Sequence, residues 1–209
     1  GFTASISCIY VAPPACPLPS NLITSSITSS GATISWTAAS PAPIGGYDYY
    51  YSTSNTAPTS STNPSGSVNG GTTTASLSGL SAATTYYFWV RSDCSTSNSD
   101  WTTSASFTTP CDAVGSFPWL ETFSNNSTTL GCWTVIDGNG DSDAWAVSTS
   151  NSQDGDQGLR LYTDFNATNQ DYAITPPIDL GSSSKELSFY TRHYSNNEPD
   201  NLTVKISTG

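Results

Sequence analysis

The feature that most constrains the fold is a series of short runs in which apolar and polar residues alternate. In the run 32–36, Ile34 and Trp36 fall on one face of an extended strand, while the threonine and serine between them fall on the other. Further runs of this kind lie at 47–51, 73–77, 86–90 and 103–107. Because an alternation of period two buries one face of a strand, the sequence predicts an all-β protein built from short strands.

The composition supports a β fold and narrows the possible partners. Aromatic residues make up 11% of the chain and include 6 Trp and 11 Tyr, which suits a thin sandwich filled by a few large rings. The formal net charge is −11, so nucleic acids and anionic membrane surfaces repel the chain. No apolar stretch approaches the length that crosses a bilayer. We therefore expect no nucleic-acid partner and no membrane insertion.

The first half of the chain has a more specific pattern. About seven short strands, spaced roughly ten residues apart, are typical of an immunoglobulin-like sandwich. Trp36 on an early strand and alternating tyrosines at 47–51 fit this pattern, and Leu80 is followed six residues later by Tyr86. With these features, residues 16–110 resemble a fibronectin type III domain.

This resemblance makes predictions about Tyr86. It implies a corner motif in which the Tyr86 ring is buried, with Phe88 and Val90 also pointing inward, and in which the Tyr86 hydroxyl bonds to the backbone of the preceding turn. The proline that the family usually carries in this turn is replaced by Ala82 or Ala83.

Some aromatic residues of this half allow a second interpretation. Tyr50, Tyr87 and Trp89 alternate with the inward-facing residues and are expected on the outer faces of the sandwich. Aromatic rings on an open sheet face can stack on sugars, so these three residues are candidates for a carbohydrate-binding platform. The alternative is that they only pack against their neighbours.

The second half, residues 111–209, contains more Asp, Asn and Gly and has longer gaps between its runs. The runs that we expect to form strands lie at 119–123, 132–135, 144–147, 158–162, 172–174, 187–191 and 202–206. The order of Glu121-Thr122-Phe123, Gly131-Cys132-Trp133-Thr134, the acidic loop 137–145, 174–180 and 200–204 resembles a bacterial jelly-roll module. The modules concerned are the cleaved-adhesin and anchor-associated types, distantly like the MAM domain, in secreted surface proteins of Bacteroidota.

This second resemblance completes the expected domain organisation. It implies a jelly-roll β-sandwich of which about the first two thirds is present, with the missing strands after Gly209. We expect residues 1–15 to be the end of a preceding domain and a proline-rich linker, and residues 16–110 and 111–209 to be the two sandwiches. The resemblance also implies export by type IX secretion.

The acidic loop that follows residue 136 is the best candidate for a functional site. Asp137, Asn139, Asp141 and Asp143 alternate with small residues, so their oxygens can converge on one cation. Hard oxygen ligands favour Ca²⁺ over zinc, although the spacing is not that of an EF-hand. The alternative is an ordinary Asp-Gly and Asn-Gly turn.

The resemblance extends this candidate calcium site. It implies that strands far apart in the sequence meet near the loop, which makes Glu121 and Asp200 further possible ligands. Asp154 and Asp156 are weaker candidates.

Five cysteines occur singly, without a Cys-x-x-Cys pair, which favours disulfides formed in an oxidising compartment. We expect Cys111 to pair with Cys132, because both bracket the first strand of the second module. Cys16 with Cys94 would tie the beginning of the first domain to its later strands, which leaves Cys8 for a partner elsewhere. The sequence therefore predicts a secreted or cell-surface location.

Signals of catalysis are close to absent, because the single histidine, His193, has no partner motif and no nucleophile elbow or phosphate-binding loop occurs. We therefore expect no enzyme. The first hypothesis is a non-catalytic adhesion or ligand-binding segment of a large exported protein, with an extracellular glycan or protein as partner besides further domains of the same chain. The alternative is an accessory segment of a secreted peptidase or glycosidase whose catalytic domain lies outside this sequence.

Overall fold

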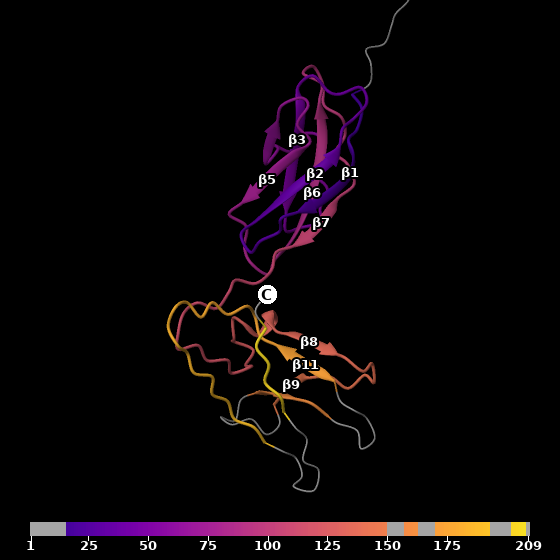
Figure 1. Ribbon diagram of the computed structural model, residues 1–209. Helices are drawn as coiled ribbons and strands as arrows, with labels where there is room; N and C mark the ends of the chain where they lie inside the picture. Colours follow the sequence, from indigo (N-terminus) through magenta and orange to yellow (C-terminus); the bar gives the residue numbers. More distant parts are fainter. Residues whose placement is uncertain (1–15, 150–156, 163–169, 193–201, 208–209) are drawn as a thin grey trace, which may run out of the picture. The chain divides into compact units, whose positions relative to one another are not determined.

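The computed structural model describes residues 16–149, 157–162, 170–192 and 202–207. The chain divides into two compact units, residues 1–112 and 113–209 (Figure 1). Among the described residues, the regular elements are strands and one short 3-10 helix at Leu130–Cys132, so the predicted all-β class is confirmed.

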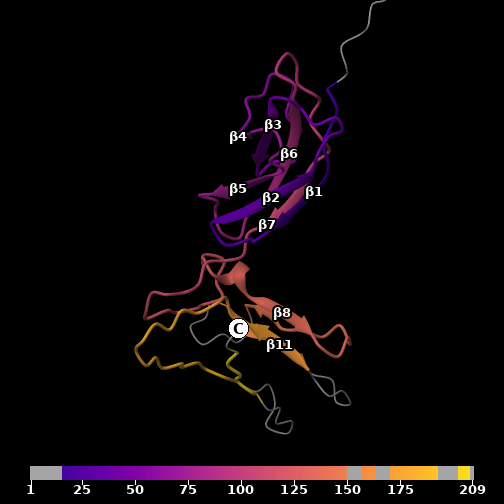
Figure 2. The ribbon, with the colours of Figure 1, turned by 45° about the horizontal axis from the view of Figure 1, so that its top comes forward.

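The first unit consists of two antiparallel sheets that lie face to face (Figure 2). One sheet has the order β1-β2-β5, from strands Ser20–Ser25, Gly31–Thr37 and Thr74–Ser78. The other has the order β4-β3-β6-β7, from strands Gly66–Val68, Gly46–Ser52, Thr85–Asp93 and Ala105–Thr108. This arrangement is an immunoglobulin-like sandwich.

The alternation in the sequence places the core between the two sheets. Ile34 and Trp36 of β2 are buried, as are Tyr86, Phe88 and Val90 of β6, which confirms the predicted inward faces. The Trp36 and Tyr47 rings meet edge to face with their centroids 5.5 Å apart, and the Tyr86 and Phe107 rings stack at 5.8 Å. A few large rings therefore fill the sandwich, as the composition predicts.

The corner motif before β6 is also present. The Tyr86 hydroxyl accepts a hydrogen bond of 2.9 Å from the backbone N–H of Ser81. Gly79 and Ala83 adopt positive φ angles of 70° and 49°, so the chain turns sharply on both sides of Ser81. The prediction for Tyr86 is confirmed.

The second unit contains two short ladders among the described residues. Strand β8 (Thr134–Asp137) pairs with β11 (Asp171–Ile174), and β9 (Ala146–Ser148) pairs with β10 (Gly158–Arg160). The predicted strands at 132–135, 144–147, 158–162 and 172–174 overlap these four elements.

Three other predicted strands of the second unit are wrong. Residues 119–123 turn instead of extending, because the Glu121 carboxylate accepts the N–H of Phe123 and Phe123 has a positive φ of 55°. Residues 187–191 and 202–206 form no ladder within the described part of the chain. Their apolar side chains stay exposed, that of Ile206 by 85%. An alternation of apolar and polar residues gives a strand one apolar face, but it does not provide the neighbouring strand with which to pair. The described residues do not show a jelly-roll.

Candidate metal centre

The candidate site lies where β8 ends and β11 begins. The two strands are antiparallel, and Asp137, the last residue of β8, is paired with Asp171, the first residue of β11. Their side chains therefore start from neighbouring positions on adjacent strands. Between them the chain leaves β8 through Gly138, where a Cβ would stand 2.0 Å from the carbonyl oxygen of Gln170. Only glycine allows the loop to pass so close to β11.

Three carboxylates converge at this point. Asp137, Asp141 and Asp171 each place one oxygen so that all three oxygens lie within 4.8 Å of one another. Asp141 belongs to the exposed loop, whereas Asp137 and Asp171 are partly buried at the strand ends. Three negative charges at this spacing repel one another unless a proton or a cation joins them.

Asp171 is the least satisfied member of the group. Both of its carboxylate oxygens are closed to solvent, and neither receives a hydrogen bond of normal geometry from the described residues. Burial raises the pKa of Asp171, and the charges of Asp141 and Asp137 raise it further. The nearby backbone N–H of Gly138 attracts the carboxylate charge and lowers the pKa, but by less than burial and the two charges raise it. The position therefore disfavours a bare carboxylate charge.

The loop is already shaped by its own carboxylates. Asp137 accepts the backbone N–H groups of Gly140 at 2.6 Å and of Ser142 at 3.0 Å. Asp141 accepts the Asn139 side-chain amide at 2.7 Å and the Asp143 backbone N–H at 2.9 Å. These bonds turn the loop back toward β11 and hold the oxygens of Asp137 and Asp141 in place.

Trp145, the last residue of the 137–145 loop, anchors the loop to β11. Its indole N–H donates a 3.2 Å hydrogen bond to the carbonyl oxygen of Asp171. The loop is thus tied to β11 at both of its ends, through the Asp137–Asp171 strand pairing and through Trp145.

The sequence-based ligand set is only partly brought together. Asp137 and Asp141 belong to the three-carboxylate group, Asp143 does not, and Asn139 binds Asp141. Asp171 was missed, because it lies more than thirty residues from Asp137 and only the β8–β11 pairing brings the two together. Asp200, Asp154 and Asp156, like the lone His193, lie outside the described residues.

Glu121, the other proposed distant ligand, has local partners. Its carboxylate accepts the Phe123 backbone N–H at 2.7 Å, the Thr129 hydroxyl at 2.6 Å and the Trp133 indole N–H at 3.2 Å. Burial acts to raise the pKa of Glu121, but the hydrogen bonds from Thr129, Ser127, Phe123 and Trp133 outweigh it, so the pKa is lowered. Glu121 therefore holds the 121–133 segment together as an ionised carboxylate.

The donor set of the site fits a hard cation. Ca²⁺ takes six to eight oxygen ligands at about 2.3–2.6 Å, from carboxylates, carbonyls and water. Asp137, Asp141 and Asp171 supply three carboxylate oxygens close enough together to share one ion. Zinc prefers nitrogen and sulfur ligands, which these three residues do not offer.

The aromatic residues on the outer face of β3 and β6 do not form an open platform. Trp89 is only 2% exposed, because Tyr50, directly opposite it on β3, packs against it at 5.9 Å between ring centroids. Tyr50 also meets the Trp101 ring edge-on at 6.3 Å. For Trp89, the alternative of packing against its neighbours is therefore the one that the structure favours, while Tyr50 and Tyr87 remain partly exposed.

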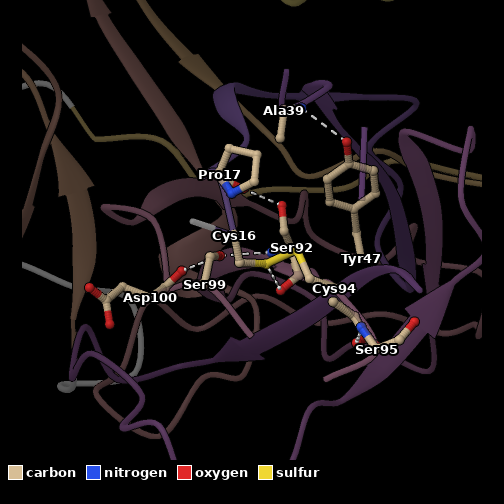
Figure 3. Close-up of a disulfide and its surroundings, with 10 residues drawn as sticks. Cys16, Pro17, Ala39, Tyr47, Ser92, Cys94, Ser95, Ser99 and Asp100 are labelled. Carbon is tan, nitrogen blue, oxygen red and sulfur yellow. Dashed lines mark hydrogen bonds between the residues drawn. A yellow bond between two sulfur atoms is a disulfide. The ribbon is translucent and has the colours of Figure 1, made fainter. Parts of the chain in front are cut away.

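A disulfide closes the first unit. Cys16 is bonded to Cys94, with their Cα atoms 5.9 Å apart, which confirms the predicted pair (Figure 3). Beside it, the Ser92 hydroxyl donates to the carbonyl oxygen of Pro17 at 2.6 Å, and the Ser92 N–H donates to the Ser99 hydroxyl at 2.9 Å. Cys111 and Cys132 are disulfide-bonded as well, as their predicted pairing requires.

The two facing antiparallel sheets define the first unit as an immunoglobulin-like β-sandwich. Residues 17–108 match the family described as "Fibronectin type III domain", and this region is a fibronectin type III domain. The match indicates no catalytic family. No curated protein matches the chain.

Several solved structures are similar to this chain. The crystal structure of an FN3 domain of human collagen XX is 24% identical and covers 49% of this chain and 100% of its own, with a TM-score of 0.38. A solution structure of the fn3 domain of the human collagen alpha-1(XX) chain is 28% identical. The match covers 51% of this chain and 97% of the collagen domain, with a TM-score of 0.38. The solution structure of the fibronectin type III domain of human fibronectin type III domain containing protein 3 is 19% identical. The match covers 48% of this chain and 93% of that domain, with a TM-score of 0.38.

Proposed function

We propose that this chain is a non-catalytic adhesion or ligand-binding segment of a secreted or cell-surface protein. Its partners are an extracellular glycan or protein and further domains of the same chain. The observation that carries this proposal is the fibronectin type III domain at residues 17–108, because such domains are commonly non-catalytic binding modules of multidomain proteins.

The cysteine chemistry supports an extracellular location. The bonded pair Cys16–Cys94 and the bonded state of Cys111 and Cys132 fit an oxidising compartment, since reducing systems keep most cytosolic thiols free. No helix within the described ranges has the length and apolar character that a membrane span requires.

The binding test uses the full chain on arrays of extracellular glycans and matrix proteins. We expect saturable binding by the folded chain and no hydrolysis of the bound glycan or protein. The heat-unfolded chain is the control for adhesion through exposed apolar surface. Equal binding by folded and unfolded chain, or turnover of a bound substrate by the folded chain, would overturn the proposal.

We further propose that the second unit holds a structural Ca²⁺ ion through Asp137, Asp141 and Asp171. The convergence of three carboxylate oxygens within 4.8 Å and the unsatisfied Asp171 carboxylate support it. The ion would offset the mutual repulsion of the three charges and hold the 137–145 loop against β11. Its role would be to stiffen the unit outside the cell, where calcium is abundant.

Thermal melts with calcium and with chelator test this site. An ion that binds only the folded state stabilises it by about 2.7 kcal/mol when its concentration is a hundred times its Kd. We expect calcium to raise the melting temperature of the wild type and of Asp112→Asn, which changes an exposed aspartate outside the three-carboxylate group. Asp171→Asn and Asp141→Asn should abolish this rise. An equal rise in all four proteins, or none in the wild type, would contradict the site.

A further inference from the structure

The Cys16–Cys94 disulfide changes which part of the first unit lies on the path of a pulling force. It joins residue 16, which precedes β1, to residue 94, which follows β6, across a sequence separation of 78 (Figure 3). A tension applied along the chain therefore passes from Cys16 directly to Cys94 through the covalent bond. Strands β1 to β6 lie inside the closed loop, so pulling cannot draw them out while the bond is intact.

The load that leaves Cys94 must pass through residues 95–110. These residues run back along the edge of β6, and hydrogen bonds join them to β6 from Asp93 to Thr85. The Ser99 N–H donates to the Ser92 carbonyl at 3.0 Å, and Thr102 exchanges two hydrogen bonds with Val90, at 3.0 and 3.1 Å. Further along, Ala105 pairs with Phe88, and Thr108 with Thr85.

The direction of this pairing decides how the load acts on the hydrogen bonds. Strands β6 and β7 are antiparallel, and Cys94 lies just beyond the end of β6 that is opposite to the end where Thr108 is paired. The two points of attachment are therefore at opposite ends of the paired strands. Pulling slides β7 along β6 and loads the hydrogen bonds together, in shear, instead of opening them one after another.

Two further contacts hold the exit of β7. Phe107 is buried in the core, stacked on Tyr86. The Thr109 hydroxyl donates to the Ser81 carbonyl at 2.7 Å and accepts the Thr84 N–H at 3.0 Å. The short segment outside the closed loop is thus fixed by ring packing and by hydrogen bonds at its loaded end.

We propose that the Cys16–Cys94 disulfide makes the fibronectin type III domain a nearly inextensible link that carries tension through the β6–β7 pair. Opening the oxidised domain frees only residues 95–110, at most about 60 Å of extended chain. Without the bond, the closed loop adds 78 residues, which amounts to about 270 Å of extended chain. The proposal rests on the proposed function only in placing the chain under tension, as part of an adhesive protein.

Single-molecule force spectroscopy on the full chain tests the proposal, with handles attached to both ends by chemistry that spares cysteine. The comparison is between the oxidised wild type and the Cys16→Ser/Cys94→Ser double variant, which keeps Cys111 and Cys132. We expect unfolding of the double variant to release about 270 Å more contour length than the wild type. Equal released lengths in the two proteins would overturn the proposal.

A second measurement does not depend on the double variant folding. An oxidised wild-type molecule is opened and held at constant force, and reductant is then added. Cleavage of the Cys16–Cys94 bond should appear as a single step of about 270 Å. The absence of that step, after mass spectrometry has confirmed the bond in the sample, would also overturn the proposal. Neither readout involves a ligand, so failure of the binding proposal leaves both tests valid.

Discussion

At the scale of single residues, the first unit contains a buried ion pair that the sequence pattern does not reveal. Asp48 and Arg91 face each other on β3 and β6 and are 7% and 6% exposed, with 2.9 Å between Oδ2 and Nη2. The Arg91 guanidinium also lies 4.5 Å above the Trp101 ring, and the Ser67 hydroxyl donates to Asp48 at 2.6 Å. Both charges are therefore compensated inside the protein.

Replacing one partner of this pair leaves the other charge buried and alone. We expect Asp48→Ala to lower the free energy of unfolding of the first unit by about 3–5 kcal/mol. Asp100→Ala, a change of an aspartate in the same unit outside this pair, is the control and should cost less than about 0.5 kcal/mol. Denaturant unfolding followed by tryptophan fluorescence measures both. A cost for Asp48→Ala no larger than that of the control would show that water, not Asp48, compensates Arg91.

Glu121 makes the second unit sensitive to acid. Its pKa is lowered in the folded state, so the ionised carboxylate stabilises the fold above the pKa of the unfolded chain, and this stabilisation is lost as the pH falls through the folded pKa. Asp171 has the opposite effect on how stability depends on pH. Its pKa is raised in the folded state, so protonation of its carboxylate on acidification favours the fold.

We expect Glu121→Gln to be less stable than the wild type at neutral pH and to lose less stability on acidification below about pH 5. Asp171 is present in both proteins, so the difference between them isolates Glu121. Melting temperatures measured in chelator from pH 7 to pH 3 give the comparison. Parallel curves for the two proteins would show that the Glu121 hydrogen bonds do not favour its ionised form.

At the scale of elements, the strands of the first unit follow from the sequence because each one carries its own alternation. The inward faces of β2 and β6, the Tyr86 corner and the Cys16–Cys94 pair could all be predicted. The local pattern does not predict contacts between residues that are far apart in the sequence. The Asp48–Arg91 ion pair and the covering of Trp89 by Tyr50 are examples.

The second unit shows the same limit more strongly. The spacing of the acidic residues predicts the acidic loop. The ligands, however, depend on which strand lies beside β8, and the local sequence pattern does not predict that this strand is β11. Asp171 was missed for this reason. The runs 187–191 and 202–206 alternate well, yet alternation cannot supply the neighbouring strand that would make them part of a sheet.

The junction of β8, the acidic loop and β11 depends on one glycine. A methyl group at residue 138 would collide with the Gln170 carbonyl, so Gly138→Ala should part the loop from β11 and weaken both the unit and its calcium response. Gly131→Ala is a matched control, because a Cβ there meets nothing within 4 Å. Melts of both variants with and without calcium test this. Identical behaviour of the two variants would contradict the close approach at Gly138.

At the scale of the whole molecule, the chain consists of two β units, and its family match is to a type of domain that is commonly non-catalytic. Cys16, Cys94, Cys111 and Cys132 are disulfide-bonded. The fibronectin type III domain and the disulfide that closes it are compatible with the proposed extracellular location. The proposed extracellular location depends on the oxidation state of the cysteines more than on any other property.

Disulfide mapping of the full chain, purified from a host that exports it, is therefore the most direct test. The protein is alkylated without reductant, digested, and examined by mass spectrometry. We predict one linked peptide pair containing Cys16 and Cys94 and another containing Cys111 and Cys132, with only Cys8 available to other partners. Complete alkylation of Cys16, Cys94, Cys111 and Cys132 in the folded, unreduced protein would contradict the account.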